Sequence, residues 1–216
     1  MKLYDSLGPN PRVVRMFLAE KGIEIALEQV DLMGGDNRRG PYLEKNPAGQ
    51  LPALELDDGS VIGEITAICE YLDEVHPEPP LIGSTPQERA ETRMWVRRCD
   101  LNIAEPMANG FRFAEGIDLF RDRLLVIPQA ADDLKATAVR NLRWLDGLMA
   151  GRQWIAGDRF TLADICLYGI VDFAAGVGQP LDPALAAVTS WYERVGARPS
   201  ATASLHEASA ATGMRG

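Results

Sequence analysis

The segment Asn46-Pro47-Ala48-Gly49-Gln50-Leu51-Pro52-Ala53-Leu54 decides how the first part of this chain folds. It is a loop that brings Pro52 to the start of an apolar strand. Proline at a strand entry is compatible with a cis peptide bond, which turns the amide and carbonyl groups of Leu51 outward. A short peptide can then pair with Leu51 as an added strand, so the segment indicates a site that holds a small peptide through its main chain.

The residues that follow predict a hairpin and then a helix. Residues 53–56 and 61–62 flank Asp57-Asp58-Gly59-Ser60, a sequence typical of a tight hairpin turn. A helix begins near Glu64, where unpaired amides suit a carboxylate and the Glu64 side chain can receive an ammonium group. The two pieces describe a ligand with one carboxylate, one ammonium group and a peptide unit. An ordinary turn followed by a helix cap is the simpler alternative, and either piece alone leaves it open.

The residues before the decisive segment complete a small α/β pattern. Leu3-Tyr4 predicts a short strand, and Asn10 is the expected N-cap of a helix with Pro11 at its first position. Alternating apolar residues over 23–27 predict a second strand, and residues 33–42 read as a loop, with a short helical turn allowed within 43–48. The order is strand, helix, strand, connection, hairpin, helix, which is the thioredoxin-like arrangement.

The pattern changes after a proline-rich stretch. Residues 77–86 contain four prolines and a glycine, and we expect them to link two domains. The predicted division is a thioredoxin-like domain over 1–76, the linker 77–86 and an all-helical domain over 87–216. Helices are expected at 87–109, 112–125, 129–149, 162–175, 184–197 and from about 200. Thr161 and Asp164 form a predicted capping box at the start of the fourth of these, which we interpret as a stability element.

An acidic composition limits the ligands that this chain can bind. The formal net charge is −9, and residues 1–80 alone carry seven Lys or Arg against fifteen Asp or Glu. Such a surface repels phosphate backbones, so nucleic-acid binding is not expected. Any anionic ligand must be held by local donors.

Cysteine, histidine and apolar patterning exclude several further classes. Cys69, Cys99 and Cys166 are odd in number and widely spaced, which does not favour a disulfide framework. The two histidines show no metal-ligand spacing, so no metal is expected. Apolar runs are too short to span a bilayer and the first residues do not read as a secretory signal, so we expect a cytoplasmic protein without a membrane partner.

Three motifs together resemble the cytosolic glutathione transferases of the bacterial type. They are NPAGQLPAL, GEITAICEYL and FTLADI, in this order and spacing, and the likeness covers nearly the whole chain. The resemblance implies that Leu51, ahead of Pro52, pairs with the cysteinyl unit of glutathione. It also implies that Glu64 and the next residues, Ile65 and Thr66, hold the γ-glutamyl end. Gln50, Arg38 and Arg39 then fall where the family commonly contacts the glycine carboxylate, although a solvated arginine pair is an alternative.

Two positions depart from the family pattern. The family usually has Ser or Thr after the glutamate, where this chain has Ile65, so one hydrogen bond worth about 1 kcal/mol is in question. Serine-type members carry their activating serine where this chain has Gly8, and no cysteine occupies that turn. The thiol therefore needs another donor to become a thiolate near neutral pH. Asn10 ranks first and Ser6 second, with the phenol of Tyr4 and the amides of Asn10 and Arg12 as further candidates.

The resemblance implies an enzyme that binds glutathione and activates its thiol for attack on a hydrophobic electrophile. We expect the electrophile against the helical domain, near Met107, Phe111 and Phe113. Peroxide or disulfide reduction and glutathione-assisted isomerisation use the same thiolate and remain alternatives. A non-catalytic ligand carrier or regulatory binding protein is a different class, and Gly8 favours it. The family also implies a homodimer.

Overall fold

The computed structural model describes residues 1–216 and divides them into two compact units. The sheet unit contains Met1–Pro80 together with Pro199–Gly216, and the helical unit contains Leu81–Arg198. The domain boundaries expected from the sequence place all of 87–216 in one domain. The structure differs at the C-terminal end, because the last segment packs with the residues of the first unit.

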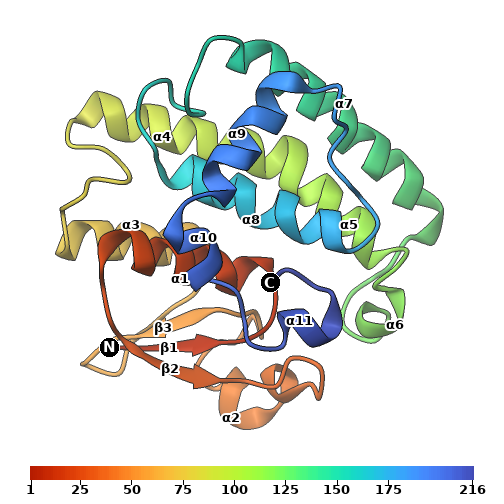
Figure 1. The fold of residues 1–216 in the computed structure, drawn as a ribbon. Coiled ribbons are helices and arrows are strands. Elements are labelled where there is room, and N and C mark those ends of the chain that lie inside the picture. Colours follow the sequence, from red (N-terminus) through yellow and green to blue (C-terminus); the bar gives the residue numbers. More distant parts are fainter. The chain divides into compact units, whose positions relative to one another are not determined.

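A four-stranded sheet with the order β2-β1-β3-β4 forms the centre of the sheet unit (Figure 1). β1 (Lys2–Asp5) is parallel to β2 (Ala26–Gln29) and antiparallel to β3 (Ala53–Glu55), and β3 is antiparallel to β4 (Val61–Ile62). The mixed sheet and its helices confirm the thioredoxin-like fold class. The hairpin predicted at Asp57-Asp58-Gly59-Ser60 is also confirmed.

Helices cover both faces of this sheet. α1 (Pro9–Lys21) and α3 (Ile65–Val75) lie on one face, and η1 (Asp36–Arg38) and α2 (Gly40–Leu43) lie on the other (Figure 1). The first face is closed by fully buried apolar side chains: Leu3, Val14, Phe17, Leu54, Ile68 and Leu72. The second face holds a smaller cluster of Tyr4, Tyr42, Leu51 and Ala53. Because Leu51 belongs to this second cluster, packing under α2 fixes the segment that decides the fold.

Two local predictions near α1 were wrong. Gly8, with φ 144°, is the N-cap of α1 and Pro9 is its first residue, so Asn10 lies inside the helix and does not cap it. The second strand begins at Ala26, because Gly22 adopts a left-handed conformation and the amide of Ile23 donates to Leu18 O at 2.9 Å, closing the end of α1. The alternation of Ile23 and Ile25 therefore reflects the exit from a helix. The helical turn allowed within 43–48 lies earlier, at α2.

The helical unit follows the predicted helices with local differences. Its elements are α4 (Pro86–Cys99), η2 (Asp100–Ala104), α5 (Glu105–Arg112), α6 (Ile117–Phe120), η3 (Pro128–Ala130), α7 (Ala131–Met149), α8 (Leu162–Gly176) and α9 (Ala186–Gly196). The helix expected over 112–125 shrinks to the single turn of α6. A π-helical segment, η2, joins α4 to α5, where one α-helix over 87–109 was expected. No helix is long and apolar enough to cross a bilayer.

A buried carboxylate organises the start of α8. Asp164 accepts hydrogen bonds from the amides of Thr161 and Ile155 and from the indole of Trp191, all at about 3 Å. The capping box predicted at Thr161 is confirmed. Burial raises the pKa of Asp164 to about 6, against the smaller opposing effect of its hydrogen bonds. This carboxylate therefore links the start of α8 to Ile155 and to Trp191 of α9.

All three cysteines are free thiols. Cys69 and Cys99 are buried, and Cys166 is partly buried on α8. Burial raises the pKa of Cys99 to about 12 and raises that of Cys166 as well. The thiols of Cys99 and Cys166 are thus kept in the protonated, unreactive form.

The last segment returns to the sheet unit as α10 (Pro199–Ala203) and α11 (Ser209–Thr212). α10 packs on α1, and the Ser200 hydroxyl donates to the Glu20 carboxylate. A last short helix from about 200 was predicted, and α10 confirms it. Its attachment to the first unit was not foreseen.

Candidate functional site

The peptide bond between Leu51 and Pro52 is cis, as the sequence suggested. The side chain of Leu51 is buried under α2, whereas its main-chain N–H and C=O have no hydrogen-bond partner in the structure. β3 begins two residues later at Ala53, which is opposite Tyr4 of β1. The segment therefore presents one free donor and one free acceptor at the end of the sheet, as an extended peptide requires.

Three polar side chains hold this segment in place. Tyr42 Oη and Asn46 Nδ2 both donate to Gln50 O, at 2.6 and 2.9 Å. Asn37 Nδ2 donates to Gly49 O at 2.7 Å. Gly49 has a positive φ of 61°, and a Cβ on it would lie only 3.0 Å from Asn37 O. Sequence reasoning missed Asn37 and Tyr42, because both lie in a stretch that reads only as an irregular loop. Asn46 was visible as the first residue of the decisive segment, but its role was not.

Asn46 also joins the two halves of the candidate site. A Cβ placed on Gly63 would lie 3.7 Å from Asn46 Nδ2, the same nitrogen that donates to Gln50 O. Gly63 immediately precedes Glu64, and Gln50 immediately precedes Leu51. The amide of one buried side chain therefore brings the free main chain of Leu51 and the start of α3 together.

Glu64 is the N-cap of α3 and has an unusual backbone conformation. Its φ of 64° is the only positive value at a residue other than glycine. Holding such a conformation costs about 1 to 3 kcal/mol, and conformations of this kind concentrate at functional sites. The Glu64 side chain is exposed and has no partner. It is therefore available to a ligand.

The first amides of α3 are available too. The first intrahelical bond runs from Ile68 N to Glu64 O, so the amides of Ile65, Thr66 and Ala67 have no helical acceptor. The Thr66 hydroxyl makes no hydrogen bond within the chain. Ile65 offers only its amide, which is the departure expected from the sequence. A carboxylate placed here meets several donors and the positive end of an 11-residue helix.

The structure separates the two arginines that the sequence treated as a pair. Arg39 forms an ion pair with Asp36 and donates to Gly34 O at 2.9 Å, so its charge is used within its own turn. Arg38 is exposed and unpaired, and its Nη1 lies 3.1 Å from where a Cβ on Gly49 would be. Gln50, which follows Gly49 in the sequence, is also exposed and its side chain has no partner. Arg38 and Gln50 are therefore close to the Leu51 segment, whereas Arg39 is bonded within its own turn.

The turn between β1 and α1 contains the candidates for activating a thiol. β1 pairs with β3 so that Tyr4 is opposite Ala53, and continuing this register places Ser6 opposite Leu51. Ser6 is 3% exposed and its hydroxyl has no partner. Asn10 is exposed in the first turn of α1, and neither its amide nor its side chain is bonded. Both residues remain candidates.

Two other candidates are already engaged. The Tyr4 hydroxyl donates to the Glu55 carboxylate on the α2 face, and Lys45 Nζ lies 2.8 Å from the same carboxylate. These two donors lower the pKa of Glu55 to about 2. The amide of Arg12 donates to Gly8 O at 3.2 Å. Because Pro9 and Pro11 have no N–H group, Asn10 keeps the only unpaired amide in the first turn of α1.

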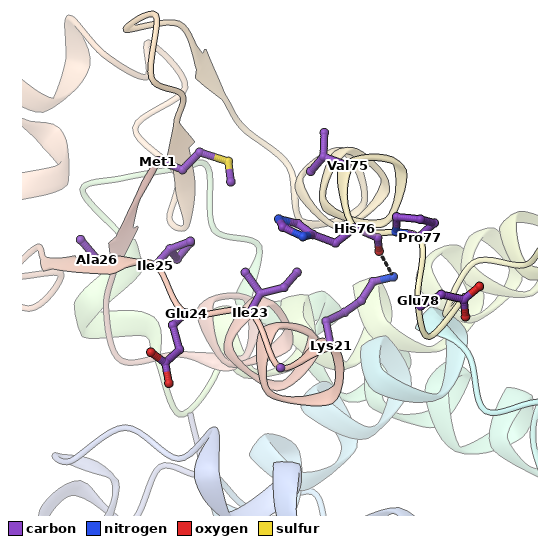
Figure 2. Close-up of a pocket in the computed structure, with 11 residues that line it drawn as sticks. Met1, Lys21, Ile23, Glu24, Ile25, Ala26, Val75, His76, Pro77 and Glu78 are labelled. Carbon is purple, nitrogen blue, oxygen red and sulfur yellow. Dashed lines mark hydrogen bonds between the residues drawn. The ribbon is translucent and has the colours of Figure 1, made fainter.

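A pocket lies at the C-terminal end of α1, and none of the candidate site residues described above lines it. Its volume is about 690 Å³, and it is lined by the ends of α1 and α3 and by the residues before β2 (Figure 2). Lys21 at its edge donates to His76 O and Pro79 O and forms an ion pair with Asp73. The lysine charge is used internally, so Lys21 offers no free cation to an anionic ligand in this pocket.

The helical unit buries two of the three residues expected near the electrophile. Met107 is 4% and Phe113 is 8% exposed. Phe111 stacks edge-on against Phe120 and Phe173. These side chains build the core of the helical unit, and the expectation that an electrophile lies near them stays untested.

The fold and the site define a class of protein: a thioredoxin-like sheet unit with a main-chain peptide site and a helix-start anion site, followed by a helical unit. Models of the glutathione S-transferase N-terminal and C-terminal domains match residues 8–75 and 128–194. Glutathione S-transferase 2 of Saccharomyces cerevisiae is 33% identical over 208 residues, which cover 93% of this chain and 87% of that relative.

Two further similarities support the same class. The crystal structure of Gtt2 from Saccharomyces cerevisiae matches with a TM-score of 0.88 and 33% identity, over 95% of this chain and 100% of that one. Maleylacetoacetate isomerase of Pseudomonas aeruginosa is 33% identical over 187 residues, covering 84% of this chain and 85% of that relative. The chain belongs to the glutathione S-transferase family. The family and the fold class predicted from the sequence are confirmed, and glutathione is the co-substrate that this family uses.

Proposed function

We propose that this chain is a glutathione transferase that binds glutathione along Leu51 and activates its thiol at the start of α1. The observation that carries the proposal is the free main chain of Leu51 beside the open start of α3, with Asn46 between them. A main-chain donor and acceptor select a peptide unit, and Glu64 with the α3 amides selects an amino-acid head. Glutathione contains both groups.

Each end of glutathione has a partner in this proposal. The cysteinyl unit pairs with Leu51, and the γ-glutamyl ammonium group meets Glu64. The γ-glutamyl carboxylate accepts from the amides of Ile65 and Thr66 and from the Thr66 hydroxyl. The glycine carboxylate lies toward Gln50 and Arg38 at the other side of the segment. Arg39 takes no part, because its charge is paired with Asp36.

The sulfur then lies toward the turn that leads into α1. Asn10 and Ser6 supply hydrogen bonds to it, and the dipole of α1 favours the anion over the thiol. The thiol proton leaves to solvent, and the thiolate attacks the electrophilic carbon. A carbon–sulfur bond forms while the leaving group departs with its bonding electrons. Burial raises the pKa of Cys99 and of Cys166, so these thiols are poor nucleophiles, and in this proposal glutathione supplies the sulfur.

Calorimetry with reduced glutathione and a conjugation assay with a generic aryl halide test the proposal. Glu64→Gln removes the carboxylate for the ammonium group, and Glu74→Gln changes an exposed glutamate at the other end of α3. A charged hydrogen bond is worth about 1.5 to 3 kcal/mol, so Glu64→Gln weakens binding about 10- to 100-fold. Glu74→Gln leaves the dissociation constant unchanged. Absence of saturable binding to the unaltered chain at millimolar glutathione would overturn the proposal.

The same experiment separates the alternative functions. Gly8 offers no hydroxyl at the place where serine-type members activate the thiol, which favours a binding protein without turnover. Binding without conjugation supports that alternative. The similarity to maleylacetoacetate isomerase favours a glutathione-dependent isomerase, which would convert a cis double bond next to a carbonyl without consuming glutathione. Peroxide or disulfide reductase activity would appear as oxidation of glutathione when a peroxide or a disulfide replaces the aryl halide.

The assembly and the location are proposals from the family resemblance. We propose a homodimer, which sedimentation velocity tests directly. We propose a cytoplasmic location, which fractionation of cells producing the chain tests.

A further inference from the structure

The segment after α10 folds back into a closed loop against the start of α1. Within residues 204–216, the amide of His206 and the hydroxyl of Ser209 both donate to Gly216 O, at 2.8 and 2.9 Å. The amide of Ser209 donates to His206 O at 2.9 Å. We call residues 204–216 the return segment. These bonds give it one defined shape, so its position is set by whatever anchors it.

Arg12 is the first anchor. It is 1% exposed, in the first turn of α1, and all three of its nitrogens point to residues near the C-terminal end of the chain. Nη2 donates to Ala201 O at 3.1 Å, Nη1 to Arg215 O at 3.0 Å and Nε to Ser204 Oγ at 3.4 Å. One planar guanidinium group therefore joins α10 to the last residues of the return segment.

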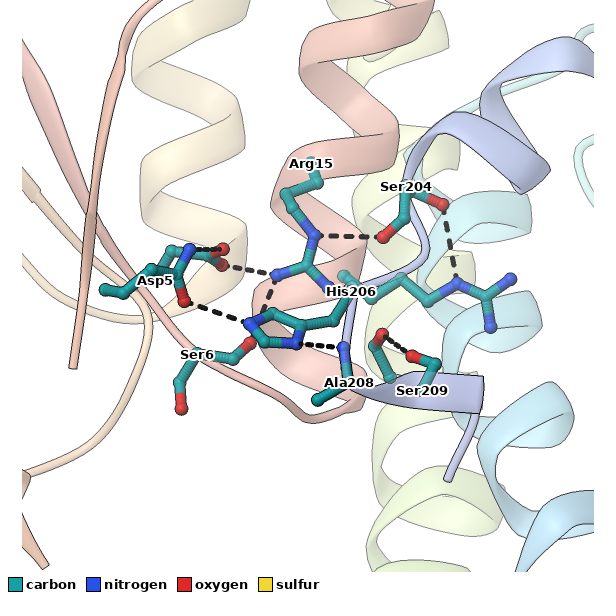
Figure 3. Close-up of polar contacts among 10 residues, drawn as sticks. Asp5, Ser6, Arg15, Ser204, His206, Ala208 and Ser209 are labelled. Carbon is teal, nitrogen blue, oxygen red and sulfur yellow. Dashed lines mark hydrogen bonds and ion pairs between the residues drawn. The ribbon is translucent and has the colours of Figure 1, made fainter. Parts of the chain in front are cut away.

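A directed chain of polar groups is the second anchor (Figure 3). Arg15 Nε donates to Ser204 O at 2.9 Å, and Arg15 also forms an ion pair with Asp5. Gln29 Nε2 donates to Asp5 Oδ2, and Gln29 Oε1 lies 2.9 Å from Nε2 of His206.

The hydrogen bonds of His206 fix its tautomer. His206 Nδ1 accepts from the amide of Ala208, so Nε2 carries the proton and donates to Gln29. The return segment is thus tied to β1 and β2 as well as to α1.

The two anchors place the return segment against the turn between β1 and α1. A Cβ built on Gly216 would lie 2.5 Å from Gly8 N and 2.7 Å from Gly8 Cα, which shows how closely the two backbones pack. Gly8 is the N-cap of α1, and Asn10 two residues later remains exposed. The segment therefore covers one side of the turn and leaves the side with Asn10 open.

We propose that the return segment is a wall of the thiol site and that Arg12 is the residue that positions it. The inference rests on the proposed function, because it takes the sulfur to lie at the start of α1. Water at this turn competes for the Asn10 amide and screens the helix dipole, and both effects favour the thiol over the thiolate. A wall that excludes water from Gly8 preserves the donor and the dipole for the sulfur.

Substitution at Gly216 tests the wall without removing either of the anchoring arginine side chains. Gly216→Ala and Gly216→Leu add one and four carbons against Gly8 and push the segment away. Gly147→Ala and Gly147→Leu are matched controls, because a Cβ on Gly147 in α7 meets nothing within 4 Å. The measurements are thiolate absorbance of bound glutathione against pH, kcat/KM with an aryl halide, and affinity for S-methylglutathione.

The Gly216 series is expected to raise the pKa of the bound thiol and to lower kcat/KM below that pKa about three- to tenfold, more for leucine than for alanine. Affinity for S-methylglutathione, which has no thiol proton, stays within about twofold. Arg12→Lys, which cannot reach three acceptors, gives the same direction of change, with circular dichroism checking the fold.

Identical thiol titrations in the Gly216 and Gly147 series would overturn the inference while leaving the proposed function intact. A parallel loss of S-methylglutathione binding would also overturn it, because the segment would then act on the peptide site and not on the sulfur. Failure of the unaltered chain to bind glutathione would reject the proposed function and the wall with it. The two failures are thus distinguished by the unaltered chain alone.

Discussion

The phenol of Tyr42 donates to the carbonyl oxygen of Gln50 at 2.6 Å, directly ahead of the residue whose main chain is left free. Tyr42 is 6% exposed, and burial raises its pKa to about 12, so it stays a donor at every physiological pH. Asn46 shares the same acceptor. The geometry of Leu51 therefore depends on the side chains of Tyr42 and Asn46, which hold the residue before it.

Tyr42→Phe removes one of these two donors. A buried hydrogen bond contributes about 1 kcal/mol, so we expect glutathione affinity to fall about fivefold and the free energy of unfolding to fall by a similar energy. Tyr71→Phe, on α3 and without a hydrogen bond, is the control for loss of a phenol. Calorimetry and urea unfolding measure the two effects. Unchanged affinity in Tyr42→Phe would mean that Asn46 and Asn37 fix the segment without it.

Asn10 and Ser6 are distinguished by substitution with alanine. Asn10 is exposed and Ser6 is 3% exposed, so Asn10 reaches a ligand without rearrangement. We expect Asn10→Ala to lower kcat/KM about tenfold and to shift its pH profile upward, and Ser6→Ala to change it less than about threefold. The reverse order would assign the sulfur to Ser6. No effect from either would leave the main-chain amide of Asn10 as the activating donor.

Arg38 and Arg39 differ in charge pairing and should differ in binding. Arg38→Ala removes a free cation near Gln50 and is expected to weaken glutathione binding about three- to tenfold, with a reduced dependence on salt. Arg39→Ala breaks only the ion pair with Asp36, so affinity stays within about twofold. Calorimetry at two salt concentrations measures both. A larger loss in Arg39→Ala would place the glycine carboxylate on the other side of the loop.

The pKa of Asp164 gives a pH dependence with a definite sign. An unfolded aspartate titrates near 3.9, whereas burial raises the folded pKa to about 6. Between these values the folded state holds a proton that the unfolded state has lost, so this residue makes the free energy of unfolding fall as pH rises.

Asp164→Asn removes that titration. The stability difference between the unaltered chain and the variant should therefore shrink from pH 4.5 to 6 and level off above it. The variant itself is less stable by about 2 to 4 kcal/mol at low pH, because asparagine cannot accept all of the hydrogen bonds. Urea unfolding at several pH values measures both. A difference that grows with pH would show that the hydrogen bonds outweigh burial.

The site was most predictable where short-range chemistry decides it. The cis bond at Leu51-Pro52 and the helix start at Glu64 were predictable because a proline at a strand entry and a helix start each have a local physical meaning. The supports, Asn37 and Tyr42, were not found, because their hydrogen bonds join residues whose spacing follows no period. Asn10 was misread as an N-cap since two alternating prolines allow two starting points, and Gly8 at φ 144° selects the earlier one.

The fold was predictable except at the C-terminal segment, which packs with the first unit and not with the helices that precede it. The sheet and the helices follow from apolar periodicity. The return of α10 and α11 to the first unit depends on Arg12 and Arg15, two buried cations within an otherwise apolar helix face, and on a tail of small residues with little hydrophobic signal. Apolar periodicity gives no sign that a buried arginine bonds to a residue far along the chain, so this packing could not be predicted from it.

The seclusion of the cysteines has a practical meaning for a chain that handles glutathione. A mixed disulfide requires a protein thiolate that can reach glutathione disulfide, and Cys69 and Cys99 are both buried, with a raised pKa for Cys99. The chain should keep these two thiols unmodified while its co-substrate cycles between reduced and oxidised forms. Its activity would then follow the supply of reduced glutathione and would not depend on the oxidation of these two thiols.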